Sequence, residues 1–229
     1  PDPVKMANIA ACSVMFHRGD VKEAQKTIYR SYSREQIMES MRLSSQMKPY
    51  FTPGFSESLP LLHKTRIMTL NGKPSEYPQI SNRKFMASDT GQLTWNIEQA
   101  DEGVVIIDTP KTQGLIGFIS DGKARAGNLS VKTKNPFASV LCSSLDGKPI
   151  GRSKRMLVTA TAKALNAGTV WNHDHTTLLD WGEEPMQIEP VVGTLQLRNI
   201  PQATELLVTP LDGSGRPMAP TVSSAFING

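Results

Sequence analysis

Hydrophobic and polar positions follow two different patterns along the chain, and the first is helical. Residues 4–16 are rich in alanine and methionine, and the His-Arg-Gly sequence at 17–19 is typical of a helix C-terminus. Residues 33–36 (SREQ) match a capping box, which predicts a second helix starting at Ser33. Residues 24–29 fit either a strand or a helical turn.

After residue 81 the pattern becomes that of β-strands. In residues 92–97, apolar Leu93, Trp95 and Ile97 alternate with polar residues, which predicts a strand with Trp95 on its buried face. More short apolar runs follow, at 104–107, 115–119, 129–131, 138–141, 156–162, 193–197 and 205–208.

Asp-Gly pairs at 121–122, 146–147 and 212–213 separate several of these runs, and their glycines are expected to supply the positive φ of short hairpins. Short strands with such turns predict a mainly β protein, namely an antiparallel β-sandwich with an N-terminal mixed α/β segment.

Domain boundaries are predicted from a change in composition. Residues 71–81 contain two prolines, a glycine and several polar residues, which favours a linker. The sequence therefore predicts a mixed helical segment over 1–70, a linker over 71–81 and the sandwich over 82–229.

Composition describes an ordinary folded protein, with 38% hydrophobic and 20% charged residues among 229. The net charge is +4, and the basic residues look scattered rather than gathered into a patch with aromatics, so nucleic-acid binding is not expected. No apolar stretch is long enough for a membrane span.

Cys12 and Cys142 lack metal-site spacing and are expected to be buried thiols. The start at Pro1 suggests a piece of a longer or processed protein.

Residues 171–175 (WNHDH) and Trp181 form the strongest candidate site. Indole rings can stack on sugar rings, so Trp171 and Trp181, with His173 and Asp174, are the predicted carbohydrate-binding residues. Packing against the core is the alternative for both tryptophans. The His-x-His pair His173 and His175 could instead ligate a metal, although a solvated loop explains it as well.

Catalytic motifs are missing from the sequence. No Gly-x-Ser-x-Gly elbow and no nucleotide-binding glycine pattern occurs, and Asp20, Glu23, Asp101 and Glu102 read as surface charge beside turns. We therefore predict no catalytic residue, no metal ligand and no cofactor.

A family resemblance extends over much of the chain. It is carried by residues 16–21, 88–91 with Trp95, 104–113, 117–118, 143–150, 153–160, 181–182 and 189–190. These segments resemble the C-terminal β-sandwich region of large bacterial glycoside hydrolase-like proteins with a clan-A type (β/α) barrel. In that family the catalytic residues lie on the barrel, so the resemblance implies that residues 1–70 form the tail of an upstream barrel.

The resemblance implies a non-catalytic accessory portion of a carbohydrate-active enzyme, which supports the barrel or its substrate cleft. The implied partners are a poly- or oligosaccharide and the upstream barrel, and the implied location is secreted, periplasmic or at the cell surface. An independent carbohydrate-binding module that uses Trp171 and Trp181 is the first alternative. A self-contained, metal-assisted hydrolase that uses His173, His175 and nearby carboxylates is the second.

Overall fold

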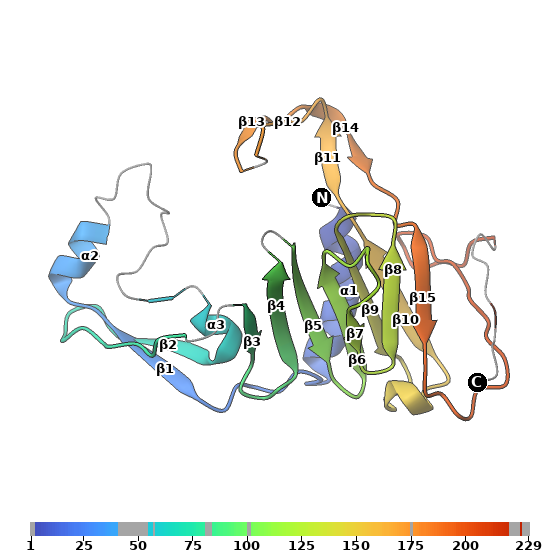
Figure 1. The fold of residues 1–229 in the computed structure, drawn as a ribbon, viewed down its shortest axis with the longest axis horizontal. Helices are drawn as coiled ribbons and strands as arrows, with labels where there is room; N and C mark the ends of the chain where they lie inside the picture. The colour runs from blue at the N-terminus through green and yellow to red at the C-terminus, as the bar shows by residue number, and fades with distance from the viewer. Residues whose placement is uncertain are drawn as a thin grey trace. The chain divides into compact units, whose positions relative to one another are not determined.

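The fold is mainly β, as the sequence predicts (Figure 1). The computed structural model describes residues 3–40, 55–56, 58–80, 84–99, 102–174, 176–219 and 225. The chain divides into two compact units: unit 1 contains residues 1–20 and 108–229, and unit 2 contains residues 21–107. The predicted linker at 71–81 lies inside unit 2, so this division differs from the predicted one.

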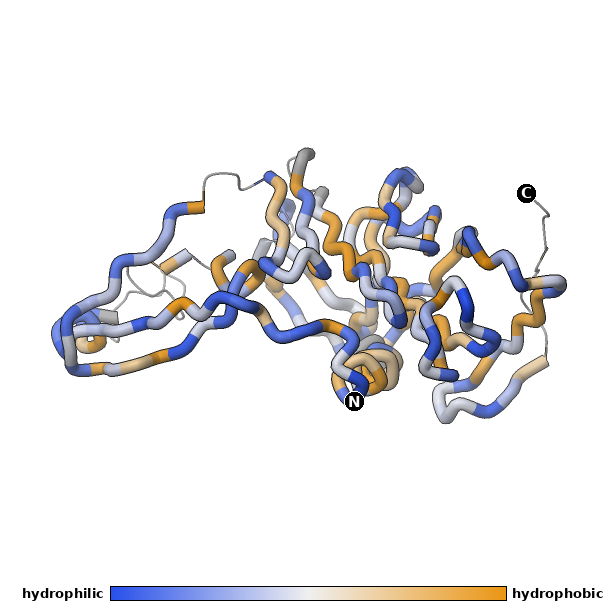
Figure 2. Tube along the Cα trace, turned by 90° about the horizontal axis from the view of Figure 1, so that it is seen from below, coloured by the Kyte–Doolittle hydropathy of each residue, from blue (hydrophilic) through white to orange (hydrophobic). Residues whose placement is uncertain are grey.

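Helix α1 (Pro3–His17) opens unit 1 and agrees with the predicted helix. It ends in a Schellman motif, in which Asp20 N–H donates to Met15 O and Gly19 N–H donates to Phe16 O, both at 3.0 Å. Gly19 has a φ of +60°, the left-handed conformation that this motif requires. Much of α1 is hydrophobic (Figure 2), because Lys5 is the only residue of Asp, Glu, Lys or Arg type within it.

Two antiparallel sheets form the centre of unit 1. Strands β10, β9 and β6 are neighbours in one, and β15, β8 and β7 in the other. Their bounds are β6 (Thr112–Gly117), β7 (Arg125–Ala126), β8 (Leu129–Thr133), β9 (Ala138–Ser144), β10 (Met156–Thr161) and β15 (Gly193–Leu197).

The core of unit 1 lies around β9, all seven residues of which are buried. Helix α1 packs on β9 and β10, while β8 contacts β9 and β6, and Figure 1 shows α1 behind the sheet and β8 in front of it. Strand β9 is thus covered on both faces, which explains why its residues are buried without alternation. Leu115, Leu129, Val140 and Ile150 are fully buried there, and each such side chain stabilises the fold by about 1.5–3 kcal/mol.

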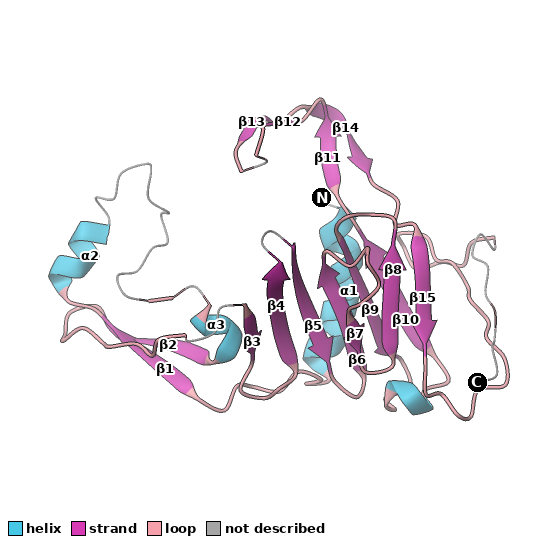
Figure 3. Cartoon of the chain, viewed as in Figure 1, coloured by secondary structure: helices cyan, strands magenta, loops and turns pink. Residues whose placement is uncertain are grey.

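A two-stranded ribbon continues from β10 within unit 1 (Figure 3). Its lower part pairs β11 (Ala164–Ala167) with β14 (Glu183–Ile188), and its upper part pairs β12 (Val170–Trp171) with β13 (Leu178–Asp180), both antiparallel. Every residue of β14 is exposed. We call residues 164–188 the ribbon.

Unit 2 combines short helices with two groups of strands. Strands β1 (Thr27–Ser31) and β2 (Lys64–Thr69) pair in parallel, and β3 (Phe85–Ala87), β4 (Leu93–Gln99) and β5 (Glu102–Asp108) pair antiparallel in that order. Helix α3 spans Leu59–Leu62. Helix α2 (Arg34–Ser40) begins at the predicted capping box, because Gln36 N–H donates to Ser33 Oγ and Ser33 N–H donates to Gln36 Oε1.

Three local predictions need correction. Residues 205–208 form no strand, and Leu206, Leu207 and Val208 are exposed, so the apolar run there is not a core segment. In the turn at 212–213 the positive φ belongs to Gly215, at +82°, and not to Gly213. Trp95 is half-buried and not fully buried as predicted. Residues 92–97 all have intermediate solvent exposure, so neither face of β4 is fully buried there.

Candidate functional site

Trp171 and Trp181 both lie on the ribbon and both reach solvent. Trp171 ends β12 and is 36% exposed, and Trp181 directly follows β13 and is 77% exposed. The alternative prediction is that both tryptophans pack against the core. Trp181 does not pack in this way, and Trp171 does so only in part. Most of the Trp181 side chain is therefore accessible to a ligand.

The backbone beneath Trp181 is held in place by its neighbours. Thr169 Oγ1 donates to Trp181 O at 3.1 Å, and Gly182 N–H donates to Asp180 Oδ1 at 2.9 Å. Gly182 has a φ of +62°, and a Cβ at that position would lie 2.2 Å from Ala167 O. Only glycine fits this close approach of the two strands, so the ribbon presents Trp181 from a constrained turn.

The loop between β12 and β13 folds around one side chain. Asn172 Oδ1 accepts hydrogen bonds from Thr176 N–H at 2.8 Å and Thr177 N–H at 3.0 Å, and Asn172 Nδ2 donates to Thr176 Oγ1 at 2.9 Å. The predicted residues His173 and Asp174 are exposed in this loop. The structure therefore brings all four predicted binding residues onto the same hairpin, with polar side chains beside Trp171.

The metal-binding alternative depends on the pair His173 and His175. His175 lies outside the described residues. Among the residues that the structure does describe, no group of three or more His, Cys, Asp or Glu side chains could hold a metal ion. Within that same part of the chain, no helix is long and apolar enough to cross a membrane.

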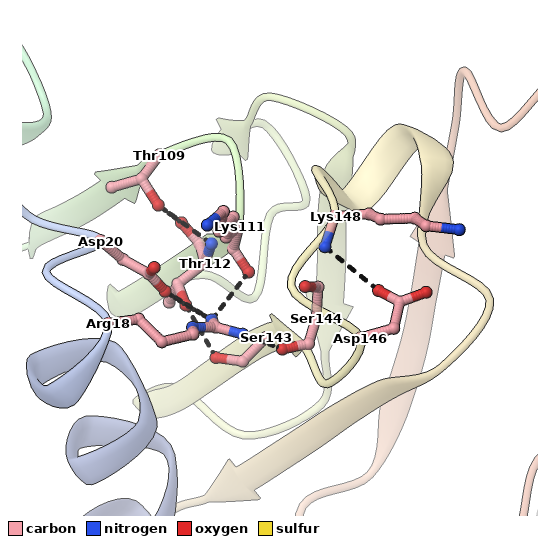
Figure 4. Close-up of polar contacts among 9 residues, drawn as sticks. All are labelled: Arg18, Asp20, Thr109, Lys111, Thr112, Ser143, Ser144, Asp146 and Lys148. Carbon is pink, nitrogen blue, oxygen red and sulfur yellow. Dashed lines mark hydrogen bonds and ion pairs between the residues drawn. The ribbon is translucent and has the colours of Figure 1, made fainter.

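A buried polar cluster in unit 1 joins segments that are far apart in the sequence (Figure 4). Arg18 Nη2 lies 2.5 Å from Asp20 Oδ2, and Thr112 Oγ1 donates to the same oxygen at 2.8 Å. Thr112 Oγ1 and Ser143 Oγ are 2.9 Å apart. The Asp20 side chain is 1% exposed, so the prediction that Asp20 is surface charge is wrong. Its charge is buried because Arg18 and Thr112 supply the partners that water would otherwise supply.

The same guanidinium group binds the backbone of two loops. Arg18 Nη1 donates to Ser144 O, and Arg18 Nη2 lies 3.5 Å from Lys111 O. Thr109 Oγ1 accepts from Thr112 N–H at 2.9 Å, which closes the turn before β6. Arg18 thus ties the end of α1 to the turn before β6 and to the end of β9. We call Arg18, Asp20, Thr112 and Ser143 the Arg18 cluster, and its hydrogen bonds describe a structural role.

Asp89 organises a second polar centre, in unit 2. Its carboxylate accepts hydrogen bonds from Gln25 N–H at 3.0 Å and Lys26 N–H at 2.8 Å, and His63 Nδ1 lies 3.0 Å away. The backbone N–H of Lys26, followed by His63, lowers the pKa of Asp89 to about 2.

Two hollows of about 150 and 250 Å³ border His63. Both are smaller than typical ligand pockets. We therefore interpret the contacts of His63 and Asp89 as structural, since they connect segments of unit 2, and not as a ligand site.

Sequence reasoning missed both polar centres, although it singled out their segments. Residues 16–21, 88–91, 104–113 and 143–150 carry the family resemblance, and they contain the members of the Arg18 cluster and Asp89. The sequence offers little indication that Asp20 is buried, because a charged side chain next to a helix-ending glycine is usually solvated.

The two cysteines differ in environment. Both are free; Cys142 is buried as predicted, whereas Cys12 is exposed, contrary to prediction, because it lies on the side of α1 away from the sheets that bury Ala11. Burial raises the pKa of the Cys142 thiol to about 12, which removes it from nucleophilic chemistry near neutral pH.

Comparisons with protein-family models, characterised proteins and solved structures give no match for this chain. The resemblance to glycoside hydrolase-like proteins therefore stays a prediction.

Proposed function

We propose that the chain is a non-catalytic accessory portion of a carbohydrate-active protein and that it contacts saccharide through the ribbon. The observation that carries this proposal is the exposure of Trp181 on a constrained turn, with Trp171 on the same hairpin. Indole faces stack on the apolar faces of sugar rings, and a fixed backbone reduces the entropy lost on binding. A secreted, periplasmic or cell-surface location belongs to the same proposal, because it would bring the chain to polysaccharide.

Polar groups beside the tryptophans suit the rest of a sugar. His173 and Asp174 are exposed next to Trp171, and they offer a hydrogen-bond donor and acceptors to ring hydroxyls. Stacking supplies affinity for a ring, and directional hydrogen bonds supply preference among sugars.

The proposed support of a catalytic barrel is based on the exposed apolar side of helix α1. Met6, Ile9 and Phe16 are exposed, and their spacing places them along one side of the helix. The opposite side packs on β9 and β10, so α1 is apolar on both sides. A helix with this composition is typical of a buried position between two layers. The gene around this chain tests the role: a reading frame without a (β/α) barrel would contradict it.

Binding of sugar by the ribbon can be measured with the whole chain. We expect titration calorimetry against a panel of neutral polysaccharides and oligosaccharides to detect at least one ligand. We expect Trp181→Ala to weaken that binding by about 1–1.5 kcal/mol, roughly five- to tenfold in Kd. Trp171→Ala should have a smaller effect because Trp171 is less exposed.

The matched control is Phe16→Ala, since Phe16 is an aromatic residue with 81% exposure that lies on α1 and not on the ribbon. It should leave the Kd unchanged. A panel with no ligand, or an equal loss in Trp181→Ala and Phe16→Ala, would refute sugar binding by the ribbon.

A further inference from the structure

A second surface of unit 1 lies in the loop between β9 and β10. Asp146 Oδ2 accepts a hydrogen bond from Lys154 N–H at 2.9 Å, and Asp146 Oδ1 accepts from Ser153 Oγ at 2.8 Å and Lys148 N–H at 3.3 Å. The backbone amides of Lys148 and Lys154 therefore lie close together, although these residues are six positions apart in the sequence. Ile150, in the 3₁₀ helix η1 (Ile150–Arg152), is fully buried and anchors the loop.

The side chains that this loop exposes are strongly cationic. Lys148, Arg152, Lys154 and Arg155 are all exposed, and we call them the basic loop. Asp146 is the only acidic residue between positions 145 and 155, and the hydrogen bonds described above occupy its carboxylate. No ion pair of the four cations occurs within the described part of the chain.

The segment that contains Lys111 is hydrogen-bonded to the start of the loop between β9 and β10. Ile150 N–H donates to Pro110 O at 2.7 Å, and Ser144 N–H donates to Lys111 O at 2.9 Å. Figure 4 shows Lys111 and Lys148 on the segments that flank Ser144. Exposed cations gathered on one short loop raise the local positive potential, which attracts an anionic ligand.

We propose that the basic loop binds the regularly spaced acidic groups of an anionic polysaccharide. This inference rests on the proposed carbohydrate function and adds to it the charge class of the ligand. Carboxylates of uronic acids and sulfate esters share the required chemistry, since both accept paired hydrogen bonds from arginine and point-charge contacts from lysine. Residues 145–155 contain no aromatic side chain, so the base stacking that holds single-stranded nucleic acid has no platform here.

Electrophoresis of the whole chain through gels that contain a polysaccharide tests the inference. The probes are polygalacturonate, dextran sulfate and neutral dextran, with single-stranded DNA as a competitor. We expect retardation by polygalacturonate, by dextran sulfate or by both, and weaker retardation at higher salt. Retardation by only one of the two anionic polymers identifies carboxylate or sulfate ester as the ligand group.

The decisive variant is Lys148→Gln with Lys154→Gln, and its control is Lys134→Gln with Lys163→Gln. All four lysines are exposed residues of unit 1, so the two double variants change the net charge equally. We expect about five- to tenfold weaker binding of the anionic polymer in the first variant and less than twofold in the control.

Three results would overturn the inference: no retardation by either anionic polymer, equal losses in both double variants, or loop-dependent binding of DNA that is as tight as that of the polysaccharides. The loop variant should leave any neutral-sugar binding unchanged, whereas Trp181→Ala should reduce it. Failure of the basic loop is therefore distinguishable from failure of the ribbon.

Discussion

Replacement of Arg18 by methionine gives the sharpest test of how unit 1 is held together. Methionine keeps an apolar stem of similar length but removes every donor of the guanidinium group. The variant loses the contact with Asp20 and the hydrogen bonds to Ser144 O and Lys111 O. Asp20 keeps the hydroxyl of Thr112, but its buried charge loses the guanidinium group that lies 2.5 Å from it.

The size of the effect follows from burial. Removal of one partner of a buried ion pair costs about 3–5 kcal/mol, because the remaining charge is desolvated without compensation. The Arg18 side chain is 21% exposed, so we expect the lower part of this range, about 3–4 kcal/mol. For a chain of this size, each kcal/mol lowers Tm by about 2–4 °C, which predicts a fall of roughly 6–16 °C.

Thermal and urea unfolding of the whole chain provide the measurement, and Arg216→Met provides the control. Arg216 pairs with Asp212 in the same unit, but its side chain is 80% exposed, so its loss should cost less than about 1 kcal/mol. We expect Asp20→Asn to recover part of the stability in the Arg18→Met background, since it removes the buried charge that Arg18 balanced. Equal stability of Arg18→Met and Arg216→Met would refute the argument.

Two further predictions concern titration and thiol chemistry. The folded-state pKa of Asp89 lies below its ordinary value of 3.8, so its contribution to stability is present above that pH and is lost as the pH falls toward 2. Asp89→Asn should therefore flatten the dependence of Tm on pH between about 4 and 2, and an unchanged dependence would contradict this role for the Asp89 and His63 pair. For the thiols, Ellman's reagent should modify Cys12 in the folded chain but leave Cys142 until denaturation; Cys12→Ser should abolish the fast reaction.

Local structure was predictable because local interactions determine it. The capping box at Ser33 is formed as predicted, since both of its hydrogen bonds join residues three positions apart. The end of α1 follows from Gly19 in the same way. Apolar runs gave most strands of unit 1, and the run at 205–208 failed because apolar composition does not show whether a partner strand exists.

The Arg18 cluster could not be predicted, because it depends on contacts across long stretches of sequence. Thr112 is 92 positions from Asp20, and Ser144 is 126 positions from Arg18. Nothing near Asp20 in the sequence distinguishes a buried carboxylate from a solvated one. The ribbon residues were easier to identify, since Trp171, His173, Asp174 and Trp181 are close in sequence and need only one hairpin to come together.

Charge separates the two proposed binding surfaces of unit 1. The ribbon contains Asp174, Asp180, Glu183 and Glu184 but no lysine or arginine, so its tryptophans favour neutral sugars and repel acidic ones. The basic loop has the opposite charge and no aromatic side chain, so it can attract an acidic polymer but offers no stacking surface for a ring. A glycan that carries both neutral and acidic residues could use both surfaces, and its affinity would then exceed that of either type alone because the second contact is intramolecular.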